Sequence, residues 1–161
     1  MNIWLEIMGT YPEREGKYLI CPIHSSTKQN YHLYRILEDL QPDDIVFHYV
    51  LQKASKRPSA FKSFSHVKNR AYIAETQDSL CPYPPPYRKV ELCNNTPLLK
   101  PITKEMLMPY KDELVLIADA SKLTRMPFDK NFRIKQLYLS RIPKGFMEIF
   151  SKLTKQKFTF M

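Results

Sequence analysis

Residue types that could do chemistry occur in this sequence without the spacing that catalysis or metal binding needs. The four histidines are spread along the chain, at His24, His32, His48 and His66. The three cysteines, odd in number and never in a C-x-x-C pair, are Cys21, Cys81 and Cys93. This pattern disfavours a zinc site or a disulfide framework and favours a reducing compartment. His48 lies in the apolar run "IVFHYV", where a buried, hydrogen-bonded histidine is more common than a ligand or a base.

Motifs of common enzymes are also absent from the sequence. The chain contains no G-x-S-x-G, no G-x-x-x-x-G-K-[ST] and no H-E-x-x-H motif. Three glycines are too few to build a phosphate-binding loop in the usual way. The adjacent Asp43 and Asp44 suit a turn better than an acid–base pair. The sequence therefore predicts a binding module that is not an enzyme and that uses no cofactor and no metal.

The charge balance indicates a polyanionic partner. The chain has 25 Lys and Arg residues against 16 Asp and Glu residues, which gives a formal net charge of +9. Nucleic acid is the commonest partner of so basic a domain, and a solvated basic surface is the alternative. No apolar run has transmembrane length and the N-terminus lacks a signal sequence. We therefore expect a soluble, cytoplasmic protein without a membrane partner.

Hydrophobic patterns predict one domain made mainly of strands. A length of 161 residues suits one core better than two. Strands are expected at about residues 3–8, 18–23, 43–50, 60–75, 87–94 and 131–143. The apolar segment 112–119, "DELVLIAD", is expected to be a strand or an extended core segment. Helices are expected at about 26–40, at 101–108 with Thr103 as the N-cap, and at 143–153 after Pro143.

Several of these segments resemble the EVE branch of the PUA-like superfamily. In that branch a Trp lies in the first strand, and an Asn-Tyr pair begins a helix that leads through a Gly-Asp turn into an aromatic strand. The similar positions here are Trp4, Asn30 and Tyr31, Asp43 and Asp44, and Phe47 to Tyr49. "VELCNNTPLLKPIT" and "NFRIKQLYLSRIPKGFMEIF" are similar to later parts, so the resemblance covers about residues 2–150. Asp43 replaces the Gly of the turn, and Ser25 or His24 replaces an aromatic residue before the helix.

The resemblance implies an α+β fold, a small, partly open PUA-like β-barrel with about three helices packed on it. It implies a single EVE/YTH-like domain at 1–155, followed at 156–161 by a tail or the start of a linker. Related YTH domains read N6-methyladenine in RNA with an aromatic cage. Similar domains also stand at the N-terminus of McrB-type restriction enzymes, where they read a modified base in DNA.

The function implied is recognition of a flipped modified base in double-stranded DNA, with N6-methyladenine or a 5-substituted cytosine as the base. The chain would then be the targeting module of a McrB-type restriction system, as part of a larger GTPase-containing polypeptide. One alternative is a PUA-like RNA-binding domain without modified-base selectivity. Another is an accessory interaction domain whose basic surface is incidental.

The resemblance and the cationic loop together suggest which residues would form the site. Residues expected to bind the base are Trp4, His24, Ser25, Asn30, Tyr31, Tyr49 and Tyr83. Stacking on an aromatic ring stabilises a bound base by about 1–3 kcal/mol. Cations expected to bind flanking phosphates are Lys53, Lys56, Arg57 and Lys62. The alternatives are that Trp4 belongs to the core, that Tyr83 packs on its neighbouring prolines and that the cationic loop is only solvated.

Overall fold

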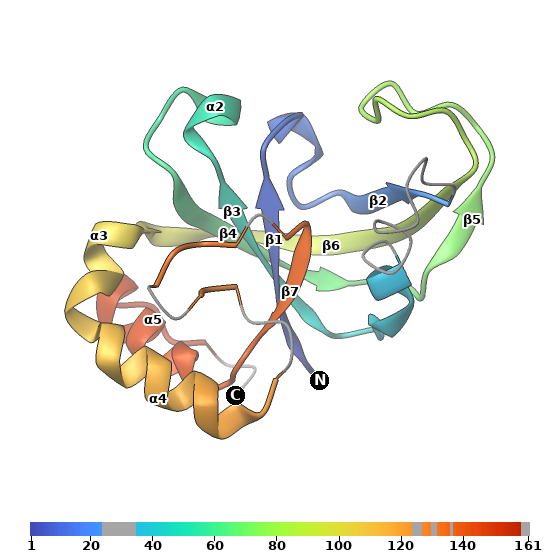
Figure 1. Cartoon of the computed structure of the whole chain (residues 1–161). Helices are drawn as coiled ribbons and strands as arrows, with labels where there is room; N and C mark the ends of the chain where they lie inside the picture. Colours follow the sequence, from blue (N-terminus) through green and yellow to red (C-terminus); the bar gives the residue numbers. More distant parts are fainter. Residues whose placement is uncertain (24–34, 124–126, 130–131, 136, 159–161) are drawn as a thin grey trace.

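A curled mixed β-sheet forms the centre of the molecule in the computed structural model (Figure 1). The structure describes residues 1–23, 35–123, 127–129, 132–135 and 137–158. The described strands are β1 (Ile3–Met8), β2 (Tyr18–Pro22), β3 (Ile45–Val50), β4 (Ala60–Val67), β5 (Tyr72–Ala74), β6 (Tyr87–Thr103) and β7 (Leu139–Ile142). They pair in the order β2-β6-β4-β3-β1-β7, with β5 also paired to β6. β1 and β3 run parallel, and the other pairs of named strands are antiparallel.

Helices and single helical turns connect these strands. In chain order they are η1 (Pro12–Arg14), η2 (Arg35–Asp39), α2 (Gln52–Ser55), α3 (Lys104–Leu107), η3 (Met108–Tyr110), α4 (Lys111–Ser121) and α5 (Phe146–Thr154). Figure 1 shows α3, α4 and α5 gathered on one side of the sheet. None of the described helices has the length and apolar character needed to span a membrane.

Alternation along β1 and β3 gives the sheet two buried faces. Leu5 and Phe47 point towards the helices, where Phe47 meets the ring of Phe150 edge-on at 5.4 Å. Trp4 and Val46 point to the opposite face, inside the curl of the sheet, and belong to a second apolar cluster. All residues of β3 are buried, as expected for a strand that is apolar on both faces. The two faces therefore have separate cores.

The segment 112–119 is helical, which corrects the expectation of a strand. It forms most of α4, with Asp112 and Glu113 in the first turn, where carboxylates interact favourably with the helix dipole. Leu114 is fully buried, and Ile117 and Ala118 pack against the same core. These three positions have the i, i+3, i+4 spacing of one helix face, a spacing that a short apolar run does not distinguish from a buried strand.

Other expected elements differ from the structure mainly in length. The expected loop 51–59 contains the single turn α2, and the expected strand 87–94 continues to Thr103 as β6. Thr103 is the N-cap of α3, as predicted, because its Oγ1 accepts from Met106 N at 3.4 Å. In the segment expected to be a tail, Phe158 is buried and packs edge-on against the rings of Phe47 and Phe64.

Candidate nucleic-acid interface

β1 and β3 end beside each other because they run parallel. Met8 pairs with Val50, and Leu51 N donates to Met8 O at 2.9 Å. The connection 9–17 after β1 and the turn 51–59 after β3 therefore project from the same end of the sheet, which we call the mouth (Figure 1). Gly9 lies beside the turn, since a Cβ at this position would be 2.8 Å from Lys53 Cε.

The turn 51–59 presents exposed cations at the mouth. Lys56 adopts a left-handed backbone (φ 56°) and closes α2 through a bond from its N–H to Gln52 O at 2.8 Å. Ser59 Oγ accepts from Gln52 N at 2.8 Å and fixes the other side of the turn. Lys53, Lys56 and Arg57 are exposed, and no described carboxylate pairs with them. Their charge is therefore free to interact with an anionic partner.

Trp4 lies in the core, which is the alternative role considered for it. Its ring is only 2% exposed, and its Nε1 donates to Asp44 Oδ2 at 2.9 Å. Asp44 also accepts from Asn2 N at 2.6 Å and from Gln41 N at 3.2 Å. The preceding Asp43 has φ 69°, so it adopts the left-handed backbone for which the resembled family has a glycine.

Tyr49 is also a core residue in this structure. It is 3% exposed, and its ring meets Phe61 edge-on at 4.9 Å on the helix-covered face of the sheet. The pKa of Tyr49 is raised to about 12, mainly by burial and also by the nearby Glu105, while the hydrogen bond with Ser59 opposes the shift. Trp4 and Tyr49 thus lie on opposite faces of the sheet, and the structure does not bring them together around one pocket.

Tyr83 is exposed to solvent, as a stacking role needs. It is 48% exposed, in the loop between β5 and β6, and its carbonyl accepts from Tyr87 Oη at 2.6 Å. This loop leads into the first residues of β6, whereas the turn 51–59 adjoins the last, so the two segments lie at opposite ends of β6 (Figure 1). Lys62 lies on β4 and is half-buried. The remaining expected base-binding residues, His24, Ser25, Asn30 and Tyr31, lie outside the described residues.

A buried polar chain beneath the mouth was not expected from the sequence. His48 is fully buried, with Nδ1 at 2.8 Å from Glu6 Oε2 and Nε2 at 2.9 Å from Ser65 Oγ. Ser65 Oγ donates in turn to Oδ1 of the exposed Asn95 at 3.1 Å. His48 is therefore the hydrogen-bonded core histidine that its strand predicted. A carboxylate in the apolar strand "NIWLEIM" was the signal that could have revealed its partner.

The connection 9–17 also contributes side chains that contact these buried polar residues. Arg14 reaches down to Glu6, with Nη2 at 3.6 Å from Oε1. Burial alone would lower the pKa of Arg14, but nearby Tyr138 and Glu6 reverse the effect and the net direction is upward. Glu15 accepts a hydrogen bond from Ser63 Oγ on β4. Within the described residues, no group of His, Cys, Asp and Glu side chains could hold a metal ion.

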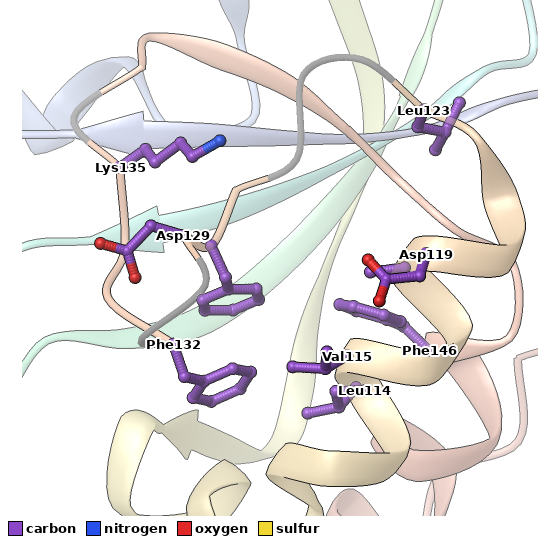
Figure 2. Close-up of a pocket in the computed structure, with 10 residues that line it drawn as sticks. Leu114, Val115, Asp119, Leu123, Asp129, Phe132, Lys135 and Phe146 are labelled. Atoms are coloured by element: carbon purple, nitrogen blue, oxygen red, sulfur yellow. The ribbon is translucent and has the colours of Figure 1, made fainter.

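A pocket of about 430 Å³ lies on the other face of the sheet, between α4 and the segments 127–129 and 132–135 (Figure 2). The rings of Phe128 and Phe132, which stack 4.4 Å apart, line it. The charged side chains among its described lining residues are Asp119, Asp129 and Lys135. Two carboxylates against one ammonium group disfavour a polyanion, so this pocket is a poorer candidate for nucleic acid than the mouth.

Comparisons with known proteins identify the fold. No protein-family profile and no curated protein matches the sequence. Human THYN1, solved in complex with DNA containing 5-methylcytosine, superposes with a TM-score of 0.58 at 14% identity over 98% of this chain and 100% of that chain. The N-terminal domain of Staphylothermus marinus McrB superposes with a TM-score of 0.54 at 14% identity over 93% of both chains.

A third similar structure is Rpa0253 from Rhodopseudomonas palustris, with a TM-score of 0.56 at 12% identity over 96% of this chain and 94% of that chain. At identities of this size a superposition establishes the fold alone. The half-barrel of mixed strands and the helices on one of its faces are shared along nearly the whole length of these proteins. The chain therefore has an α+β PUA-like fold, which confirms the fold predicted from the sequence.

Proposed function

We propose that this chain is a DNA-binding module that reads a modified base, and that the mouth is its binding surface. The observation that carries this proposal is the shared fold with human THYN1, which was solved bound to DNA containing 5-methylcytosine. The net charge of +9 and the unpaired cations of the turn 51–59 support it, because phosphate contacts supply most of the affinity of DNA-binding proteins.

The proposed mechanism separates affinity from selectivity. Lys53, Lys56 and Arg57 bind phosphates beside the modified base, and Lys62 adds a weaker, half-buried charge. The base itself leaves the stack, since its edges are otherwise paired, and this costs a few kcal/mol. Stacking on Tyr83 stabilises the extruded base by about 1–3 kcal/mol. A methyl group held in an apolar pocket favours the modified base over the unmodified one by a similar amount. Trp4 and Tyr49 are buried in the two cores and are not part of the proposed contact with the base.

Fluorescence anisotropy with matched short duplexes tests the proposal. The duplexes carry no modification, 5-methylcytosine or N6-methyladenine, and an RNA of the same sequence completes the set. We expect one modified duplex to bind about 5- to 150-fold more tightly than the unmodified one. Equal affinity for all duplexes would instead favour nonselective binding, and tighter binding of the RNA would favour an RNA-binding domain. Absence of salt-sensitive binding would leave only an accessory role.

The phosphate contacts have their own test. Replacing Lys53, Lys56 and Arg57 together by Gln should reduce the slope of log K against log salt by about 0.9 for each phosphate that is no longer neutralised, so by up to about 2.7. A control triple variant at the α5 end of the molecule, Lys152→Gln with Lys155→Gln and Lys157→Gln, removes the same charge from exposed positions. Equal effects of the two triple variants would show that net charge, rather than the mouth, binds the phosphates.

Base extrusion and the stacking role of Tyr83 are measured separately. A 2-aminopurine next to the modified base should brighten on binding if that base leaves the stack. Tyr83→Ala should weaken binding of the modified duplex by about 5- to 150-fold. Tyr83→Phe keeps the ring and should bind like the wild type. An unchanged affinity of Tyr83→Ala would remove this ring from the site.

The likeness to a McrB N-terminal domain supports a restriction system as the biological setting. In that setting the present chain targets modified DNA, and a GTPase on the same or a partner polypeptide drives cleavage. Sequencing of the native locus tests this point. A GTPase-encoding frame that continues or adjoins this one is the expected result, and its absence from the locus would argue for an independent DNA reader.

A further inference from the structure

We infer that Asn95 is a base-reading residue of this chain, and that the buried Glu6, His48 and Ser65 fix the orientation of its amide. This inference rests on the proposed function and adds a residue that contacts the base edge. The amide NH2 group of Asn95 donates to an acceptor on the base, which is a ring nitrogen or a carbonyl oxygen.

The backbone of β6 is distorted where Asn95 lies. Phe64 pairs with Thr96 and His66 pairs with Cys93, so Asn94 and Asn95 lie together opposite the single residue Ser65. Such a bulge re-aims side chains, and bulges are frequent beside functional sites. Asn94 takes up the distortion with a left-handed backbone (φ 53°).

The connection 9–17 also leaves space for the Asn95 side chain. Gly16 has φ 72°, and a Cβ at this position would lie 2.3 Å from Asn95 Cγ. Only a glycine combines this backbone with so close an approach. The connection 9–17 thus holds one side of the Asn95 amide, while Ser65 holds its oxygen. The exposed Lys17 follows Gly16 directly, and neither Glu13 nor Glu15 of this connection has an ion pair among the described residues.

The donor and acceptor roles along this row of hydrogen-bonded side chains decide which group of the Asn95 amide is left to bind a ligand. The Glu6 carboxylate only accepts, so His48 Nδ1 donates to it. Ser65 Oγ donates its proton to Asn95 Oδ1 at 3.1 Å and lies 2.9 Å from His48 Nε2. The oxygen of Asn95 is therefore occupied. Its NH2 group donates no hydrogen bond to the described residues and is available to a ligand.

The buried charges and the unusual backbone near Asn95 cost folding free energy, so stability alone does not explain them. Glu6 and Arg14 are 1% and 8% exposed, and removing a charged pair from water carries a penalty that its own attraction often fails to offset. A left-handed asparagine and a glycine-dependent contact lie close to the same amide. Costly features of this kind concentrate where a side chain must be held in one orientation for binding.

The test compares two neighbouring asparagines. Asn95→Asp removes the NH2 donor and adds one negative charge, and Asn94→Asp adds the same charge on an exposed residue outside the polar chain. With the same set of duplexes and RNA, we expect Asn95→Asp to weaken binding of the preferred duplex by about 5- to 150-fold more than Asn94→Asp does. Asn95→Ala should lose a similar factor without the charge.

Ser65→Ala tests the positioning role, since it frees the amide of Asn95 to rotate. We expect the ratio of modified to unmodified affinity to fall in this variant while the salt dependence stays that of the wild type. A merely structural role would lower the melting temperature and leave that ratio unchanged, which would overturn the positioning role.

The outcomes separate this inference from the proposed function. If the wild type prefers a modified duplex but Asn94→Asp and Asn95→Asp bind alike, the role of Asn95 is wrong and the function stands. If the wild type shows no preference for modification and Asn95→Asp still loses far more than Asn94→Asp, Asn95 reads a base and modified-base recognition is wrong. If the wild type binds none of the nucleic acids, both are wrong.

Discussion

Cys21 illustrates how burial sets the chemistry of a single residue in this fold. Burial raises the pKa of its thiol to about 12, although Arg88 opposes the shift. At pH 8 only about one Cys21 in 10,000 is then a thiolate, against about a quarter of free cysteines. We predict that iodoacetamide leaves Cys21 unmodified in the native protein and alkylates it in urea, as followed by peptide mass spectrometry. Rapid labelling of Cys21 in native protein would show that β2 opens readily.

Residue roles were predictable from sequence where the cause is local. Thr103 caps its helix because a threonine before a run of helix formers does so in most contexts, and Asp43 adopts the turn backbone that its residue type tolerates. Asn95 could not be found in this way. Its position depends on a bulge opposite β4 and on Gly16, which is 79 positions away in the chain.

At the scale of elements, Asp44 joins the first strand to the turn before β3. Its carboxylate accepts from Asn2 N, Trp4 Nε1 and Gln41 N, and it is 1% exposed. We predict that Asp44→Ala lowers the unfolding free energy by about 2–4 kcal/mol, because buried donors lose their acceptor. Urea unfolding followed by Trp4 fluorescence measures this change.

The neighbouring Asp43 provides the matched control for that prediction. Asp43→Gly removes a carboxylate from the same turn but suits the left-handed backbone, so its unfolding free energy should stay within about 1 kcal/mol of the wild type. A loss in Asp43→Gly as large as that in Asp44→Ala would mean that the turn, rather than the three hydrogen bonds, holds β1 in place.

The elements themselves were predicted best where one physical cause dominates. β3 is apolar on both faces and could be read as a buried strand, and α5 follows Pro143 with a clear apolar face. α4 was misread because "DELVLIAD" fits a buried strand as well as one face of a helix. The choice is made by the packing of Leu114 and Ile117 over the sheet, which is tertiary information.

At the scale of the whole molecule, the sheet separates two kinds of interior. The helix-covered face carries an aromatic core and the pocket of Figure 2, whereas the face inside the curl carries Trp4 and, towards the mouth, the polar chain from Glu6 to Asn95. Sequence alternation shows that β1 and β3 have two faces but not which one the helices cover. The predicted rings Trp4 and Tyr49 were therefore assigned to one pocket although they belong to opposite faces.

The many buried phenols and thiols make the stability of the whole fold sensitive to alkali. Burial raises the pKa of Tyr49 and of Cys21 to about 12 and also raises that of Tyr138. In the unfolded chain these groups titrate near 8.5 for cysteine and 10 for tyrosine, so between about pH 8.5 and 12 the native state binds more protons than the unfolded state. The unfolding free energy is then fully maintained below about pH 8.5 and falls as the pH rises through that window.

Urea unfolding at a series of pH values checks this dependence, with Tyr49→Phe as the diagnostic variant. Each raised group steepens the loss by at most about 1.4 kcal/mol per pH unit in its own window. Tyr49→Phe should therefore lose stability less steeply than the wild type between about pH 10 and 12. Below about pH 8.5 the two curves should run parallel, because Tyr49 is then neutral in both states. Identical slopes above about pH 10 would mean that Tyr49 reaches solvent in the native state and is free to ionise there.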